Sequence, residues 1–194
     1  TSSAVAIPAL QNLSAIPVIG VIEPGAEQAA KTTKNKRIGV IGTEGTIHSG
    51  AYTVAINKLL PEAVIFSQPC PLFVPLVEEG WQEHYVADII AEEYLADMKK
   101  QNIDTLVLGC THYPLLSKTI QKVMGEEVTL VDSAKAIAAY LSCYLDREND
   151  GQKGKDTFYV SDNESKFSEI AQRILQDNIS NLTRVHLYES WFKD

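Results

Sequence analysis

The stretch that most constrains the fold is residues 105–116, Thr-Leu-Val-Leu-Gly-Cys-Thr-His-Tyr-Pro-Leu-Leu. Residues 105–109 are apolar, branched and too few for a helix, which predicts a strand covered on both faces. Such strands are typical of parallel sheets, whose carboxyl ends open into the crevice where α/β proteins bind ligands. Cys110, Thr111 and His112 follow the strand, so we expect them at such a crevice. Pro114 suits the first turn of a following helix, since the amide hydrogen it lacks would have no partner there.

The thiol of Cys110 has two interpretations. A free cysteine is most often a small core residue. A thiol near the amino terminus of a helix and beside an imidazole can instead have its pKa lowered, which makes thiolate available near neutral pH. The position of Cys110 after the strand and two residues before His112 favours the second interpretation. Such a thiol would suit a base or a nucleophile.

Strand-like and helix-like stretches alternate along the chain. Strands are predicted at residues 16–22, 37–42, 63–67, 105–109, 128–131, 157–160 and 184–188, and helices at 3–13, 51–60, 81–101, 115–124, 134–145 and from 162–163 to about 175. Glu23-Pro-Gly25 is expected to be a break, three prolines at 69, 71 and 75 an irregular path up to Glu78, and residues 147–155 a surface loop. The alternation predicts an α/β fold with a mostly parallel sheet.

Composition excludes several classes of protein. With 194 residues and 45% hydrophobic content, the chain can bury its own core without disulfides or a structural metal. A net charge of -8 without a basic run gives no electrostatic basis for binding nucleic acid. Three widely spaced cysteines match neither a disulfide framework nor a zinc motif, which favours the reducing cytoplasm. No apolar run approaches the roughly 20 residues of a membrane span, and no export signal is recognised.

Residues 109–116, Gly-Cys-Thr-His-Tyr-Pro-Leu-Leu, resemble the second cysteine motif of the cofactor-independent aspartate/glutamate racemases. Four further stretches resemble the same family in its order and at its spacing, namely residues 16–26, 41–52, 70–80 and 131–134. Together the five stretches cover most of the chain. The resemblance implies a small amino-acid substrate, neither cofactor nor metal, and a homodimer.

The fold implied by this resemblance has two doubly wound, mostly parallel three-layer α/β domains, one inserted into the other. Mapped onto this chain, residues 24–131 would be the complete second domain, while residues 1–23 and 132–194 would belong to the first. Residues 1–6 resemble the segment directly after the first cysteine motif of the family. We therefore expect the first domain to be incomplete here, with one of two catalytic thiols outside the chain. The 194-residue chain by itself is then expected to be inactive.

Inverting an α-carbon requires one acid/base group on each side of the substrate, and preorganised donors for the carboxylate as charge develops on it. By resemblance, Cys110 is one of these groups, His112 is its partner and Glu78 assists. The residues implied to contact substrate are Thr1, Thr43, Thr46, Thr111 and His112. From sequence alone, Thr43 and Thr46 could equally be helix N-caps, and Glu78 or Glu79 could be a solvated residue at a helix start.

The Gly-Cys-Thr-His-Tyr-Pro pattern and the stretch Val-Glu-Glu-Gly at residues 77–80 favour glutamate as the substrate, with D-glutamate supplied to bacterial peptidoglycan. Racemisation of aspartate, another two-cysteine isomerisation, and a binding role without catalysis remain alternatives. An amino-terminal nucleophile hydrolase using Thr1 would require stacked antiparallel sheets, which the alternation disfavours. Cys70 and Cys143 are expected to be structural, and His48, His84 and His186 to be surface or satisfied residues.

Overall fold

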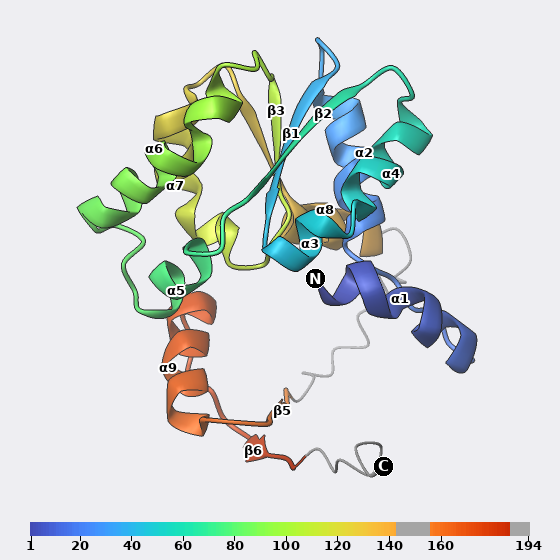
Figure 1. Ribbon diagram of the computed structural model, residues 1–194. Coiled ribbons are helices and arrows are strands. Elements are labelled where there is room, and N and C mark those ends of the chain that lie inside the picture. The colour runs from blue at the N-terminus through green and yellow to red at the C-terminus, as the bar shows by residue number, and fades with distance from the viewer. Residues whose placement is uncertain (143–155, 187–194) are drawn as a thin grey trace, which may run out of the picture. The chain divides into compact units, whose positions relative to one another are not determined.

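The computed structural model describes residues 1–142 and 156–186 and divides the chain into two compact units, Thr1–Asp146 and Arg147–Asp194. The first unit contains a four-stranded parallel sheet in the order β2-β1-β3-β4 (Figure 1). Its strands are β1 Arg37–Gly42, β2 Val64–Pro69, β3 Thr105–Leu108 and β4 Thr129–Asp132. The predicted parallel α/β fold is therefore confirmed.

Helices cover both faces of this sheet (Figure 1). On one side lie α2 Ile22–Thr32, α4 Ala51–Leu59 and α8 Ser133–Leu141, and on the other α5 Phe73–Glu78, α6 Tyr85–Lys99 and α7 Ser117–Met124. Successive residues of a strand face opposite sides, so each strand serves two cores. Val40 and Val107 pack with α2 and α4, whereas Ile41 and Leu108 pack with α5, α6 and α7. This double coverage explains why β1 and β3, after their first residues Arg37 and Thr105, contain only apolar residues.

One predicted strand, residues 16–22, is wrong. Residues 16–21 form no strand, and Ile22 begins α2 instead. Ile16 is 74% exposed and Ile19 is 37% exposed, so these two isoleucines are not buried in the described part of the chain, whereas Ile22 is buried in α2. The run has the local pattern of a strand, but a strand forms only where a neighbouring strand satisfies its backbone hydrogen bonds.

The expected breaks at two prolines are also wrong. Pro24 lies in the first turn of α2 and Pro75 in the first turn of α5. The first turn of a helix leaves its amide hydrogens without helical partners, so a proline there costs no hydrogen bond. The irregular path predicted up to Glu78 is confirmed at residues 70–72, which form a turn, and is replaced by α5 from Phe73 onwards. The short helix α3 Glu44–His48 was not predicted.

Most other predicted elements are present with shifted ends, but the strand predicted at residues 184–188 shares only Arg184 with β6 Leu182–Arg184, and residues 187–188 lie outside the described residues. The helices α1 Ser2–Leu13 and α9 Glu164–Leu175 match predicted helices, and a 3-10 turn η1 Tyr113–Leu116 with Pro114 at its start leads into α7. The surface loop predicted at residues 147–155 and the last residues of the helix predicted at 134–145 lie outside the described residues.

The second unit, as far as it is described, is one strand-helix-strand motif. The strands β5 Phe158–Val160 and β6 Leu182–Arg184 pair in parallel, with Phe158 opposite Leu182. Asn163 caps α9 by accepting a hydrogen bond from the Lys166 amide at 3.0 Å, as predicted. Phe167 of the helix faces Phe158 with ring centroids 6.3 Å apart. The division into domains at residues 24–131 remains a prediction.

Candidate active site

The carboxyl ends of β1 and β3 lie side by side, because Ile41 pairs with Leu108 in register. A cavity of about 360 Å³ opens there. The predicted site residues that line it are Thr1, Thr43, Cys110, Thr111 and His112. Residues far apart in the sequence therefore share one cavity, at the position where parallel sheets bind ligands.

Three threonine hydroxyls form a cluster in and beneath this cavity. The Thr1 Oγ1 lies 2.6 Å from the Thr43 Oγ1 and 3.1 Å from the Thr46 Oγ1, and the latter two oxygens are 3.0 Å apart. Thr43 also caps α3 by accepting a hydrogen bond from the Thr46 amide at 3.2 Å, so the N-cap interpretation holds for Thr43. Thr46 is buried, with 3% of its surface exposed. The cluster offers hydroxyl donors where the cavity could receive a carboxylate.

Glu78, His112 and Cys110 contact one another in succession, and Cys110 and His112 line the same cavity. The Glu78 Oε1 is 3.4 Å from the His112 Nε2, and the His112 Nδ1 is 4.0 Å from the Cys110 Sγ. The Thr111 Oγ1 lies 3.5 Å from the same Nδ1. A carboxylate beside Nε2 favours the tautomer that carries its proton on Nε2, which leaves the Nδ1 lone pair facing the thiol. The imidazole can then accept a proton from the sulfur.

Burial raises the pKa of the Cys110 thiol above its ordinary value, against the lowering expected from its local sequence. Desolvation is the largest cause, since removing water penalises the charged thiolate. Hydrogen bonds from the backbone of His112 and Tyr113 and from the Thr111 side chain act in the opposite direction without overcoming it. The resting thiol is therefore protonated near neutral pH, and the nearest ring nitrogen of His112 is 4.0 Å from its sulfur.

This pKa shift predicts the pH dependence of Cys110 alkylation. Because only the thiolate reacts, we expect the rate with iodoacetamide to keep rising with pH, with its midpoint above about 8.5, the ordinary value for cysteine. The rate should be followed at the Cys110 peptide by mass spectrometry. A midpoint at or below the ordinary value would contradict the dominance of desolvation.

The turn that carries Cys110 requires glycine at position 109. A Cβ added to Gly109 would lie 2.8 Å from the Ile41 carbonyl oxygen and 3.0 Å from a ring carbon of Tyr52. The neighbouring strand and α4 therefore approach the backbone too closely for any side chain. Ser133, at the start of α8, also lines the cavity, although sequence reasoning named no role for it.

The other candidate residues lie away from this cavity. Cys70 is fully buried, which raises the pKa of its thiol to about 12, in keeping with a structural role. His48, His84 and His186 are exposed, as expected, and Cys143 lies outside the described residues. In the described ranges, no group of three or more His, Cys, Asp or Glu is placed to hold a metal ion, and no helix has the length and apolarity to cross a membrane.

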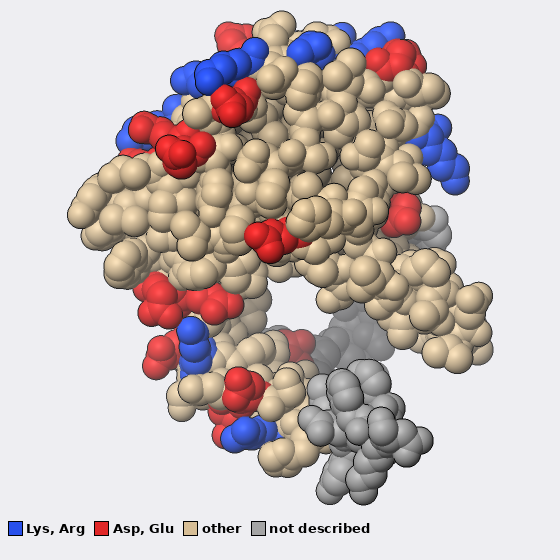
Figure 2. All heavy atoms as spheres, viewed as in Figure 1, with Lys and Arg blue, Asp and Glu red and all other residues tan. Residues whose placement is uncertain are grey.

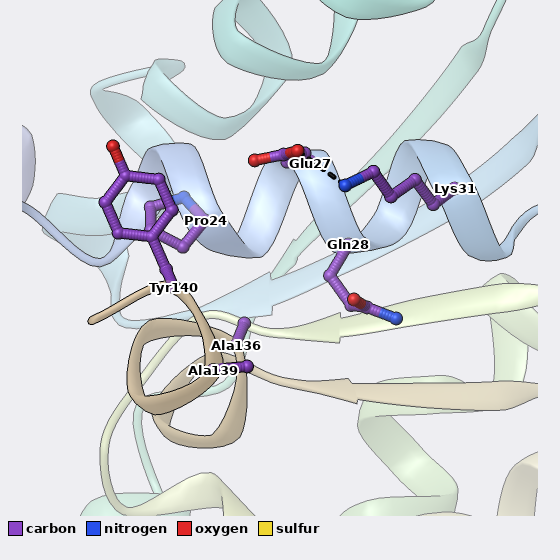
Figure 3. Close-up of a pocket in the computed structure, with 7 residues that line it drawn as sticks. All are labelled: Pro24, Glu27, Gln28, Lys31, Ala136, Ala139 and Tyr140. Carbon is purple, nitrogen blue, oxygen red and sulfur yellow. Dashed lines mark hydrogen bonds and ion pairs between the residues drawn. The ribbon is translucent and has the colours of Figure 1, made fainter. Parts of the chain in front are cut away.

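The surface away from this site carries charged side chains of both signs and further cavities. On the face drawn in Figure 2, the Lys and Arg side chains of the first unit lie among Asp and Glu side chains. A second cavity of about 200 Å³ lies between α2 and α8, where Pro24 faces Tyr140 and Glu27 pairs with Lys31 (Figure 3). None of the residues predicted to act in catalysis lines it.

The model of one protein family, described as Asp/Glu/Hydantoin racemase, matches residues 1–141. A glutamate racemase of Geobacter metallireducens is 46% identical over 192 residues, which cover 96% of this chain and 71% of that protein. The chain belongs to the Asp/Glu/Hydantoin racemase family. A glutamate racemase of Lactiplantibacillus plantarum is 48% identical over 180 residues, covering 90% of this chain and 66% of that protein.

Solved structures of this racemase family have the same fold. A crystal structure of a glutamate racemase from Bacillus anthracis superposes with a TM-score of 0.88 at 39% identity and covers 96% of this chain and 71% of its own. A glutamate racemase from Francisella tularensis, crystallised in complex with D-glutamate, gives a TM-score of 0.79 at 34% identity. The match covers 95% of this chain and 70% of that protein. The resemblance described from sequence motifs is thus confirmed at the level of family and fold.

Proposed function

We propose that the protein containing this chain is a glutamate racemase, an isomerase that interconverts L- and D-glutamate by moving the α-proton. The observation that carries the proposal is the cavity lined by Cys110, His112 and a cluster of threonine hydroxyls. A relative named as a glutamate racemase, 46% identical over nearly the whole chain, supports glutamate as the substrate.

In the proposed reaction, Cys110 exchanges a proton with one face of the substrate α-carbon. The His112 Nδ1 takes the proton of the thiol, and Glu78 at the His112 Nε2 stabilises the imidazolium that forms. The thiolate then removes the α-proton. In the reverse direction the protonated thiol returns a proton to the same face. Desolvation makes the thiolate a stronger base, which suits abstraction from a weakly acidic carbon.

The substrate carboxylate gains negative charge as the α-proton leaves, because the intermediate is enediolate-like. Hydroxyl donors fixed at that carboxylate stabilise the developing charge without having to reorganise. We infer that the Thr1 and Thr43 hydroxyls rotate their protons from one another to the bound carboxylate, while contacts with Thr46 keep their oxygens in place. The exposed Thr111, beside His112 at the cavity, is inferred to contact the same substrate.

Inversion also requires a second acid/base group on the opposite face of the α-carbon. We infer that this group is another thiol, carried by the domain to which residues 1–23 and 132–194 are proposed to belong. We further propose that the enzyme is a cytoplasmic homodimer and needs neither cofactor nor metal. Its product D-glutamate would supply peptidoglycan synthesis.

Exchange with deuterated water tests this function. The protein containing this chain is expected to replace the α-hydrogen of both L- and D-glutamate with solvent deuterium, without added pyridoxal phosphate and in the presence of a metal chelator. Mass spectrometry of the recovered amino acid measures the exchange. Faster exchange of aspartate than of glutamate would contradict the proposed substrate, and exchange that depends on a cofactor would contradict the mechanism.

A further inference from the structure

Fixing the position of the Cys110 sulfur requires that its turn be held from several sides. The Gly109 amide donates a hydrogen bond to the Ile41 carbonyl oxygen at 2.8 Å, which ties the turn to β1. The Ser133 hydroxyl, on α8, donates to the Leu108 carbonyl oxygen at 3.0 Å. These bonds reach two consecutive residues of the backbone, directly before Cys110.

The ring of Tyr52, on α4, packs against the same turn from the core between the sheet and α2. This ring would lie 3.0 Å from a Cβ at Gly109 and 3.2 Å from a Cβ at Gly25 on α2, so it fills the space between two glycines. Tyr52 and Ser133 are each 3% exposed. Neither glycine could carry a side chain without displacing the ring, so the contact depends on all three residues.

The far end of the loop is also anchored. The Tyr113 hydroxyl donates a buried hydrogen bond to the Cys70 carbonyl oxygen at 2.8 Å. Residues 109–113 are therefore held at both ends, while Cys110, Thr111 and His112 between them face the cavity.

We propose that Ser133 and Tyr52 are positioning residues, which act by fixing the Leu108–Cys110 turn and so the place of the catalytic sulfur. The proposal rests on the proposed racemase function. It also explains why residues from separate motifs of the sequence, which carry Gly25, Tyr52, Gly109 and Ser133, meet at one point below Cys110. Proton transfer is sensitive to such placement, because a displacement of about 1 Å can lower a rate by about a hundredfold.

The test is Ser133→Ala, which removes one hydroxyl and adds no bulk. We expect kcat to fall by about tenfold to a hundredfold in both directions while KM for glutamate stays close to wild type. The pH midpoint for alkylation of Cys110 should rise, since the backbone amides of His112 and Tyr113 would no longer be aligned on the sulfur. Ser133→Thr, which restores a hydroxyl, should recover most of the lost kcat.

Thr119→Val is the matched control. Thr119 is 7% exposed and its hydroxyl donates to the Gln82 carbonyl oxygen at 3.3 Å, so it is also a buried hydroxyl bonded to the backbone, but it does not line the cavity. The control should keep the kcat and the alkylation midpoint of the wild type. A purely structural role for Ser133 would lower thermal stability as in the control and leave both values unchanged, which would overturn the proposal. A rise in KM with unchanged kcat would also overturn it, since that indicates direct substrate contact.

Tyr52→Leu tests the same proposal from another helix. Removing the ring between Gly25 and Gly109 should lower kcat and raise the Cys110 alkylation midpoint, as Ser133→Ala does. A folded Tyr52→Leu variant with wild-type values would contradict the inference even if Ser133→Ala were too unstable to assay. If the wild-type protein did not racemise glutamate, the proposed function would fail, while the alkylation midpoints would still decide whether the turn is held as described.

Discussion

Replacing Cys110 with serine is expected to lower racemisation of both glutamate enantiomers by about 10²–10⁴-fold, the usual contribution of a general acid/base group. The serine hydroxyl has nearly the size of the thiol but is a far weaker acid, and His112 cannot generate useful alkoxide from it. The half-buried position of Cys110 should accept serine, so the thermal midpoint should change little. Polarimetry from each enantiomer and a thermal melt measure the two quantities.

Cys70→Ala is the control for the loss of a thiol elsewhere. Cys70 is fully buried against the core and its side chain does not line the cavity, so this variant should lose thermal stability but keep the kcat of its folded fraction. Wild-type turnover in Cys110→Ser would remove Cys110 from the mechanism, and with it the relay through His112 and Glu78.

Truncating Phe73 is expected to lower the free energy of unfolding by about 3–5 kcal/mol, the usual cost of Phe→Ala in a core. Phe73 is fully buried at the start of α5, edge-to-face against Tyr94 at 5.4 Å and Tyr113 at 5.2 Å between centroids. Such aromatic pairs stabilise beyond the burial of their area. The change is measured by unfolding the protein in urea and monitoring hydrogen exchange in peptides of the first unit.

The comparison for this variant is Val54→Ala. Val54 is 69% exposed on α4, and its truncation should change the free energy of unfolding by no more than about 0.5 kcal/mol. A loss below about 1 kcal/mol in Phe73→Ala would show that the cluster relaxes around the void. Because Tyr113 anchors the loop that carries His112, Phe73→Ala should also reduce racemisation per folded molecule.

The parallel sheet could be predicted because buried strands and covering helices leave different periods in the sequence. Residues 37–42 match β1 at both ends, since a strand covered on both faces is a nearly continuous apolar run, here residues 38–42. Residues 16–22 carry a similar pattern and form no strand. Periodicity reports which residues avoid water, whereas strand formation depends on a partner elsewhere in the chain.

The candidate site was predicted as a set of residues but not as an arrangement. Cys110, His112 and the threonines could be named from motifs, and the parallel sheet explains why two strand ends bring them to one cavity. The direction of the Cys110 pKa was wrongly predicted from its neighbours in sequence. Local neighbours show hydrogen bonds and charges, but desolvation depends on what other elements place over the thiol.

By itself, the sequence determined the alternation of strands and helices, the family and the chemical groups available for proton transfer, because these depend on residue type and spacing. Only the tertiary structure decided which groups meet. The three threonine hydroxyls, the line from Glu78 to Cys110, and the support of Gly109 by Tyr52 and Ser133 all join residues from different elements. Such contacts depend on how the helices pack over the sheet, and they cannot be deduced from the separation of the residues along the chain.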